Sequence, residues 1–239
     1  MDTRFYGAGL PKADAANLPG HLIVIEGADG VGRSTHLELL QGWLEGHGFA
    51  VASTGLARSA LTRRGIVEAK EGHNFDRTTM SLFYATDLAD RLENAMMPAL
   101  RSGFVVLADR YIFTMIARGA ARGLSAEWLA KVYGFAIVPE RVFFLRLPPD
   151  DLIRRILRRG SDIDYWESGR DIGLAPDLYT SFRKYQAMIL QQFDQMSEPY
   201  GFQILDASRT VEEVQAELRR GLAGILDPTL FQPNPDAPG

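Results

Sequence analysis

The chain has 239 residues, a length that suits one large α/β domain, and its hydrophobic fraction of 46% is ordinary for a globular protein. A formal net charge of −4 argues against a nucleic acid polymer as ligand, and the absence of cysteine excludes disulfides, thiol chemistry and thiolate metal sites. No apolar run reaches the length of a membrane span, and the N-terminus lacks the apolar region of a signal peptide. We therefore expect a cytoplasmic protein that does not act at a membrane.

Residues 1–20 contain two prolines and three glycines with little periodicity, which predicts an N-terminal extension. From residue 21 onward, short apolar runs alternate with amphipathic stretches. The apolar runs predict strands at residues 21–26, 50–53, 104–108, 141–147 and 202–205. The amphipathic stretches predict helices at residues 33–46, 58–72, 77–101, on both sides of Gly123, and at 150–159, 177–197 and 210–225. The proline-rich end, residues 227–239, predicts a flexible tail.

Five short strands that alternate with helices predict a five-stranded parallel sheet covered by helices on both faces, which is a three-layer α/β sandwich. In such sheets, ligands bind at the carboxyl ends of the strands. Three motifs follow strands at that edge: a glycine-rich loop after residue 26, Thr54-Gly55, and Asp109-Arg110. We expect these three motifs to form one site.

The glycine-rich loop has the spacing G-x-x-x-x-G-R-S, a P-loop in which arginine stands where the pattern has lysine. Its backbone N–H groups would cradle phosphate oxygens, and the helix that follows would point its positive end at the same anion. The Ser34 hydroxyl would bind Mg²⁺. The alternative is a tight strand-to-helix turn that needs glycine for geometry alone. The predicted ATP-binding residues are Gly27, Ala28, Asp29, Gly30, Val31, Gly32, Arg33, Ser34 and Thr35.

With these motifs in place, the chain resembles the thymidylate kinase family, a branch of the nucleoside monophosphate kinases, over roughly residues 20–226. The segments that carry the resemblance are the loop 27–35, the segment 82–87, Asp109-Arg110-Tyr111, Arg159-Gly160 with Asp164 and Glu167, and Asp206-Ala207-Ser208. The resemblance implies one kinase domain over residues 21–226 with a lid at about 154–176. It also implies Mg²⁺ as cofactor with ATP, a nucleoside monophosphate as acceptor, and a homodimer, for which the apolar stripe of helix 77–101 is a candidate interface.

The family's reaction moves the ATP γ-phosphoryl group to the monophosphate and depends on positioning and charge neutralisation. The resemblance implies that Arg110 pairs with the acceptor phosphate and that Asp109 joins Ser34 in holding Mg²⁺. Asp29 would lie near the same centre. The arginine-rich stretch before Gly160 resembles the family's lid. The predicted catalytic residues are Arg33, Arg110, Arg158, Arg159 and Asp29.

The acceptor site departs most from the family pattern. Tyr84 fits the aromatic position that stacks on the base, but Leu88 stands where the family has an arginine that bonds the base edge. Arg118 stands where an aromatic residue is common. Both Tyr84 and Leu88 also fit a purely structural place in a helix core. The predicted acceptor-binding residues are Arg58, Tyr84, Leu88, Arg110, Thr114 and Arg118.

These departures keep three functions open. The first is an ATP-dependent kinase of a deoxynucleoside monophosphate, most simply dTMP to dTDP. The second is a kinase of the same fold with another acceptor, because a site without the arginine at position 88 loses a base-edge donor. The third is a nucleotide-binding protein with little phosphoryl transfer, because a planar guanidinium at position 33 is wider than an ammonium. Since 22 of the 26 basic residues are arginine, Arg33 also fits a general preference for arginine in this sequence.

Overall fold

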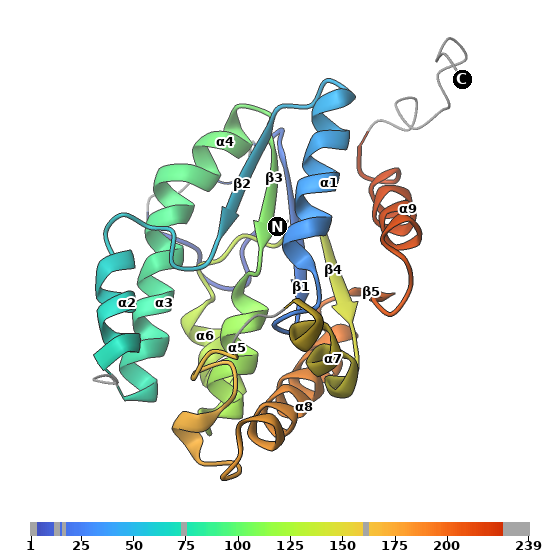
Figure 1. Cartoon of the computed structure of the whole chain (residues 1–239). Coiled ribbons are helices and arrows are strands. Elements are labelled where there is room, and N and C mark those ends of the chain that lie inside the picture. Colours follow the sequence, from blue (N-terminus) through green and yellow to red (C-terminus); the bar gives the residue numbers. More distant parts are fainter. Residues whose placement is uncertain (1–3, 12–14, 16–17, 73–75, 160–162, 227–239) are drawn as a thin grey trace.

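The structure is a computed structural model that describes residues 4–11, 15, 18–72, 76–159 and 163–226, apart from the side chain of Arg159. Within these residues, five strands form one parallel sheet in the order β2-β3-β1-β4-β5. The strands are β1 (His21–Gly27), β2 (Val51–Gly55), β3 (Val105–Asp109), β4 (Arg141–Arg146) and β5 (Gln203–Asp206). This arrangement confirms the predicted α/β sandwich (Figure 1).

Successive strand residues point to opposite faces of the sheet, and each face is buried under its own helices. One face packs against α1 (Arg33–Gly46), α7 (Pro149–Arg159) and α9 (Val211–Leu222). The other packs against α3 (Arg77–Arg91), α4 (Met97–Arg101), α5 (Ile112–Ala121), α6 (Ala126–Val132) and α8 (Leu178–Ser197). The helix α8 also contributes Phe182 to the core on the first face, so it takes part in the cores on both sides of the sheet.

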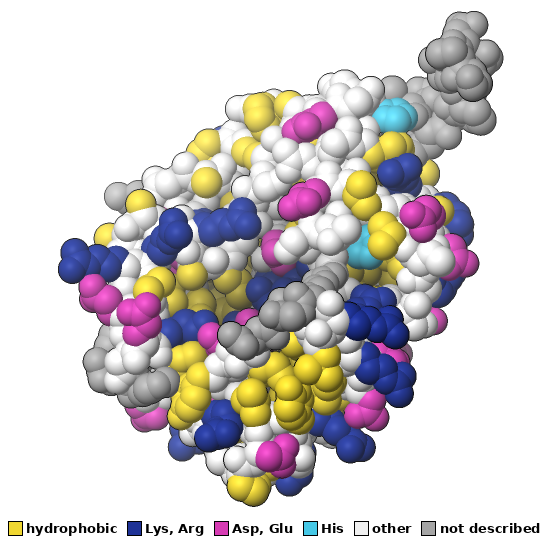
Figure 2. Space-filling model, viewed as in Figure 1, with side chains coloured by type: hydrophobic (Ala, Val, Ile, Leu, Met, Phe, Trp, Pro, Cys, Tyr) yellow, Lys and Arg dark blue, Asp and Glu magenta, His cyan; other side chains and the backbone are white. Residues whose placement is uncertain are grey.

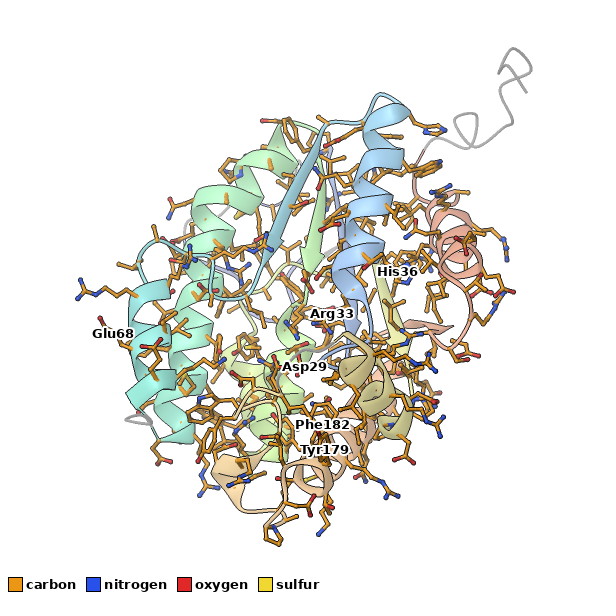
Figure 3. All side chains as sticks on the ribbon, viewed as in Figure 1. Asp29, Arg33, His36, Glu68, Tyr179 and Phe182 are labelled. Carbon is orange, nitrogen blue, oxygen red and sulfur yellow. The ribbon has the colours of Figure 1, made fainter. Side chains whose placement is uncertain are left out.

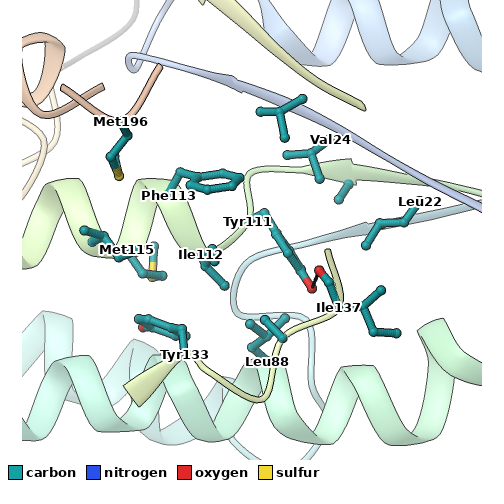
Figure 4. Packing of buried hydrophobic residues seen from close by; sticks show 14 of the residues in the cluster. Leu22, Val24, Leu88, Tyr111, Ile112, Phe113, Met115, Tyr133, Ile137 and Met196 are labelled. Atoms are coloured by element: carbon teal, nitrogen blue, oxygen red, sulfur yellow. Dashed lines mark hydrogen bonds between the residues drawn. The ribbon is translucent and has the colours of Figure 1, made fainter. Parts of the chain in front are cut away.

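The long helix predicted at 77–101 is one run of helical turns with a π-helical turn, Leu92–Met96, between α3 and α4. Its apolar residues Leu88, Leu92 and Met96 are buried in the core. Figure 4 shows Leu88 in this core together with Tyr111 and Tyr133. The apolar stripe considered as a dimer interface is therefore part of the core of this chain, and the homodimer stays a prediction.

The described part of the N-terminal extension packs against the domain. Phe5 forms an antiparallel bridge with Ile137, and the Tyr6 N–H donates to the Ala136 carbonyl at 3.0 Å. The Tyr6 ring meets the ring of Phe113 edge-on at 6.1 Å. Burial against these rings raises the pKa of the Tyr6 hydroxyl. The predicted tail and part of the lid, residues 160–162, lie outside the described residues.

The helix α2 (Arg63–Gly72) stands beside α3 at the edge of the fold (Figure 1). Among the described residues, no helix combines the length and the apolarity needed to cross a membrane.

Candidate functional site

The loop between β1 and α1 has a backbone that glycine alone adopts without strain. Gly30 and Gly32 have φ angles of 84° and 104°. A Cβ on Gly27 would lie 2.8 Å from the Leu145 carbonyl oxygen, so the loop packs directly on β4. Because Gly32 carries no side chain, the first N–H groups of α1 stay open to an anion. The loop therefore fits both the tight turn and the phosphate cradle predicted from its sequence.

Arg33 folds back under this loop. Its Nε donates to Asp109 Oδ1 at 2.8 Å, and its Nη1 donates to the Ala28 carbonyl at 2.6 Å and to the Gly27 carbonyl. The side chain is only 7% exposed. Figure 3 shows Arg33 next to Asp29 at the start of α1. Its guanidinium therefore braces the carbonyl side of the loop and holds a carboxylate at the end of β3.

Asp29 gathers the cationic groups of the site. It accepts from Nη2 of Arg110 and from Nη2 of Arg118, the latter at 3.1 Å on Oδ1 and 3.0 Å on Oδ2. Burial alone would raise the pKa of Asp29, but the nearby guanidinium groups, led by that of Arg118, outweigh it and lower that pKa. Asp29 is therefore a carboxylate that joins the loop to β3 and α5.

The residue Arg110 adopts a left-handed backbone, with φ of 69°, which is rare for a residue with a side chain. Its N–H donates to the Ile25 carbonyl at 3.1 Å, so the turn is pinned to β1. Burial and the charge of Arg33 lower the pKa of Arg110, whereas Asp29 raises it. Strained backbone at the end of a central strand is typical of positions where a side chain must be aimed.

A buried carboxylate in β1 orients the start of α5. Glu26 accepts from the N–H of Tyr111 at 2.8 Å and from the N–H of Thr114 at 3.1 Å, and the Thr114 hydroxyl donates to its other oxygen. Burial raises the pKa of Glu26, and these hydrogen bonds oppose that shift. Thr114 is 4% exposed and bound to Glu26, and its predicted role in acceptor binding stays a prediction. The sequence signal that was missed is an acid inside an apolar strand.

Next to this cluster lies a cavity of about 970 Å³ between α2, α3, α5 and the segment 165–174. Figure 2 shows a hollow near the centre of this face with basic and hydrophobic side chains in and around it. Tyr84, Met115 and Arg118 line the cavity, so the structure brings two predicted acceptor residues together. Leu88 is not among the lining residues: it is 2% exposed in the core, as in the structural alternative predicted for it, and its acceptor contact stays a prediction.

The loop after β2 is fastened to α3 by a buried ion pair that sequence reasoning missed. Asp87 accepts from the N–H groups of Ala57 at 3.1 Å and Ser59 at 3.0 Å, and from Arg91 Nε at 2.8 Å. Arg91 also donates to the Thr54 hydroxyl at 2.9 Å. These bonds fix the loop that carries Arg58.

The side chain of Arg58 is exposed, yet its guanidinium returns to the sheet edge. Its Nε lies 3.1 Å from the position that a Cβ on Gly55 would take. Because Gly55 pairs in register with Asp109, Arg58 lies at the same strand ends as the glycine-rich loop.

The three arginines of α7 whose side chains the structure describes have different surroundings. Arg155 donates to the Val31 carbonyl at 2.7 Å and to the Ala207 carbonyl, so α7 is tied to the loop and to the residue after β5. Arg158 is exposed, and Arg154 pairs with Asp151 on the surface at 2.9 Å. The side chain of Arg159 lies outside the described residues. The structure thus singles out Arg155, which the sequence did not separate from its neighbours.

A magnesium ion would find oxygen donors at the start of α1. Ser34 is exposed there, and Asp109 lies at the end of β3 with Arg33 on its Oδ1 atom. A hydroxyl and a carboxylate are the ligand types that Mg²⁺ takes beside nucleotide phosphates. Within the described part of the chain, no three His, Asp or Glu side chains cluster to hold a metal by themselves. The donor set therefore suits an ion that also binds a phosphate.

Comparison with known proteins agrees with this geometry. The family model described as thymidylate kinase matches residues 25–218. A probable thymidylate kinase 2 from Saccharolobus solfataricus is 36% identical over 88% of this chain and 99% of its own length. A probable thymidylate kinase from Pyrococcus abyssi is 30% identical over 83% of this chain and 94% of its own. A thymidylate kinase from Leifsonia xyli is 33% identical over 87% of this chain and 97% of its own length. The chain therefore belongs to the thymidylate kinase family.

Proposed function

We propose that this chain transfers the γ-phosphoryl group of ATP to a deoxynucleoside monophosphate, with dTMP as the acceptor and dTDP as the product. The observation that carries the proposal is the contact of Asp29 with Arg110 and Arg118. It joins an anion-binding loop to a cavity of about 970 Å³, which is large enough for a nucleotide. The name of the relatives, thymidylate kinase, supports dTMP as the acceptor.

The glycine-rich loop, residues 27–35, binds the ATP phosphates through its backbone N–H groups. Arg110 and Arg58 neutralise the acceptor phosphate, since both lie at the strand ends beside that loop. Tyr84 stacks on the acceptor base inside the cavity. Ser34 and Asp109 would hold Mg²⁺, which neutralises phosphate charge when it is bound.

The lid, at about residues 154–176, closes over ATP and excludes water. Arg155 fixes its first helix to the loop through the Val31 carbonyl, and Arg158 or Arg159 supplies an arginine to the moving phosphoryl group. We also propose a homodimer on the strength of the family resemblance. Val67 on α2 and Leu82 on α3 are exposed on neighbouring helices and could take part in it. Analytical ultracentrifugation tests this assembly.

A second candidate is a nucleotide-binding protein with little phosphoryl transfer. The position of Arg33 favours it, because three of its hydrogen bonds go to protein oxygens on the loop and Asp109. A third is a kinase with another acceptor. Leu88 in the core and Met115 in the cavity wall favour it, because neither can donate a hydrogen bond to a base edge.

A coupled assay of ADP release over a panel of deoxynucleoside and ribonucleoside monophosphates tests the proposal. We expect the highest kcat/KM with dTMP. Preferred turnover of a different monophosphate would move the proposal to the third candidate. If no monophosphate is turned over but calorimetry detects ATP or ADP binding with Mg²⁺, the nucleotide-binding candidate takes its place. Absence of both turnover and binding would rule out every candidate.

A further inference from the structure

Arg122, directly after α5, joins three parts of the fold through one guanidinium. Its Nε and Nη2 bond both oxygens of Asp171, at 2.7 and 3.1 Å, and Nη2 also donates to the Trp166 carbonyl at 2.9 Å. Its Nη1 donates to the Tyr185 hydroxyl on α8. The guanidinium carbon lies 4.8 Å from the centre of the Tyr185 ring and 5.8 Å from that of Trp166. The segment 163–174 is thus fastened to both α5 and α8.

The opposite side of this segment is tied to α2. The indole Nε1 of Trp166 donates to the Lys70 carbonyl at 3.0 Å, a contact between residues 96 positions apart. Arg122, Trp166 and Lys70 all line the cavity, and so does Asp171. The segment therefore crosses the cavity from α5, where the Arg122 fork holds it, to α2, where the Trp166 indole holds it. On its other side, three side chains of α8 donate to its carbonyl groups: Ser181, Lys184 and Gln186.

Arg122 also shares a helix face with Arg118, the cavity residue that holds Asp29. The two arginines are four positions apart, and Arg122 Nη1 lies 3.3 Å from the Arg118 carbonyl oxygen. Both ion pairs, Arg118 with Asp29 and Arg122 with Asp171, are mostly buried. Paired guanidinium groups in such surroundings have few alternative positions, because breaking either pair leaves a poorly solvated charge. Loss of the contact between Arg122 and Asp171 should therefore loosen both segment 163–174 and the wall of the cavity at Arg118.

We propose that Arg122 and Trp166 are positioning residues that hold segment 163–174 as the outer wall of the acceptor cavity and thereby set the affinity for the acceptor. This inference rests on the proposed function. If the wall is already ordered, acceptor binding loses no conformational entropy there. If the wall is loosened, the acceptor must order it on binding, and this entropic cost lowers the affinity. The glycine-rich loop has contacts of its own with Arg33 and Arg155, so ATP binding should depend less on these two attachments than acceptor binding does.

The first variant is Arg122→Lys, which keeps the charge and removes the fork to Asp171. We expect faster amide hydrogen exchange in segment 163–174 and a KM for dTMP raised by about 10-fold, the usual effect of losing a charge-assisted hydrogen bond. We expect the KM for ATP to rise by less than the KM for dTMP, because the glycine-rich loop keeps its own contacts, and kcat to change by less than about 2-fold. The matched control is Arg146→Lys, because Arg146 makes the same two-point contact with Asp194, at 2.9 and 3.1 Å, on the outer surface.

The second variant is Trp166→Phe, which keeps an aromatic ring but removes the indole N–H and part of the ring area. It keeps the inference testable if Arg122→Lys does not fold. We expect the same changes at a smaller size, with the KM for dTMP raised by about 3-fold, as for one neutral hydrogen bond.

Unchanged exchange in segment 163–174 in both variants overturns the inference, and so does an equal rise in the KM values for dTMP and ATP. The exchange measurement needs no turnover. If the wild-type chain fails to phosphorylate any monophosphate, the proposed function falls, while the exchange data still decide whether these residues hold the wall.

Discussion

Nη2 of Arg118 on α5 contacts both carboxylate oxygens of Asp29 in the glycine-rich loop, at 3.1 and 3.0 Å. One side of this pair belongs to the predicted ATP loop, and the other lines the predicted acceptor cavity. Arg110 shares the same carboxylate from the end of β3. A change in the position of Asp29 should therefore affect both the ATP loop and the acceptor cavity.

Replacement of Arg118 by glutamine should reduce kcat/KM for dTMP by about 10- to 100-fold, because a charged contact in the cavity wall is lost. Steady-state kinetics at varied dTMP measure this effect. The control is Arg64→Gln, since Arg64 forms an exposed ion pair with Glu68 on α2. A variant at Arg118 with wild-type kcat/KM would remove this residue from the acceptor site.

The pH dependence of stability should reveal the charge of Asp29. Its folded-state pKa is lowered from the ordinary 3.8, so its ionised form stabilises the fold. That contribution is complete above the unfolded pKa and is lost as the pH falls through the folded pKa. The difference in unfolding free energy between wild type and Asp29→Asn should be constant from about pH 6 to pH 8 and shrink below about pH 4. Urea denaturation at several pH values measures it, and a difference that grows in acid would contradict the assignment.

The buried pair of Asp87 and Arg91 should be a major source of stability. Asp87 is 0% exposed and Arg91 is 4% exposed. Asp87→Asn should lower the free energy of unfolding by about 3 kcal/mol, because it leaves a buried guanidinium without its counter-charge. Denaturation in urea measures the loss, and Glu68→Gln on the surface serves as the control, with an expected change below about 0.5 kcal/mol.

In the double variant of Asp87→Asn with Arg91→Met, the two losses should be less than additive, because both substitutions remove the same ion pair. Strict additivity would mean that the two residues stabilise the fold independently. The same variants should weaken acceptor binding, since the loop that carries Arg58 is fastened by Asp87.

The strands, the main helices and the loop 27–35 could be predicted because their signals are local. The apolar run of β3 is enough to predict a strand, and the spacing of Gly27 and Gly32 is enough to predict the loop, without knowledge of distant residues. The contacts of Arg33 could not be predicted in this way. Whether the Arg33 guanidinium binds a phosphate, a loop carbonyl or a carboxylate depends on Asp109. This residue lies 76 positions away and is brought near by strand pairing.

The acceptor site is harder to predict than the loop, because its candidate residues sit on helices whose rotation the sequence leaves open. Tyr84 and Leu88 are one turn apart, yet Tyr84 lines the cavity and Leu88 packs in the core. A small rotation of α3 separates the two outcomes. The contacts of Thr114 were hard to predict for another reason: its partner Glu26 is a buried acid that needs hydrogen-bond donors, and it lies 88 positions away in the sequence.

Arg33→Lys is the sharpest test of the loop. Lysine is a compact charge that can leave the loop carbonyls and reach the phosphates, whereas the guanidinium is held by the Ala28 carbonyl and Asp109. We expect kcat with ATP and dTMP to rise by at least about 10-fold, which corresponds to about 1.4 kcal/mol of the barrier. We also expect the nucleotide-free variant to be less stable by about 1–2 kcal/mol, because charge-assisted bonds are lost.

Steady-state kinetics and thermal unfolding of the same preparations measure the two effects of Arg33→Lys, and Arg64→Lys on the surface of α2 is the matched control. A fall in kcat would mean that the site operates with the guanidinium in place, so that Arg33 is a working part of the loop. A rise in kcat with lower stability would mean that Arg33 stabilises the loop and, in doing so, lowers kcat. That result would place the present chain between an efficient kinase and a nucleotide-binding protein, because one side chain then decides how much of the phosphate site is open.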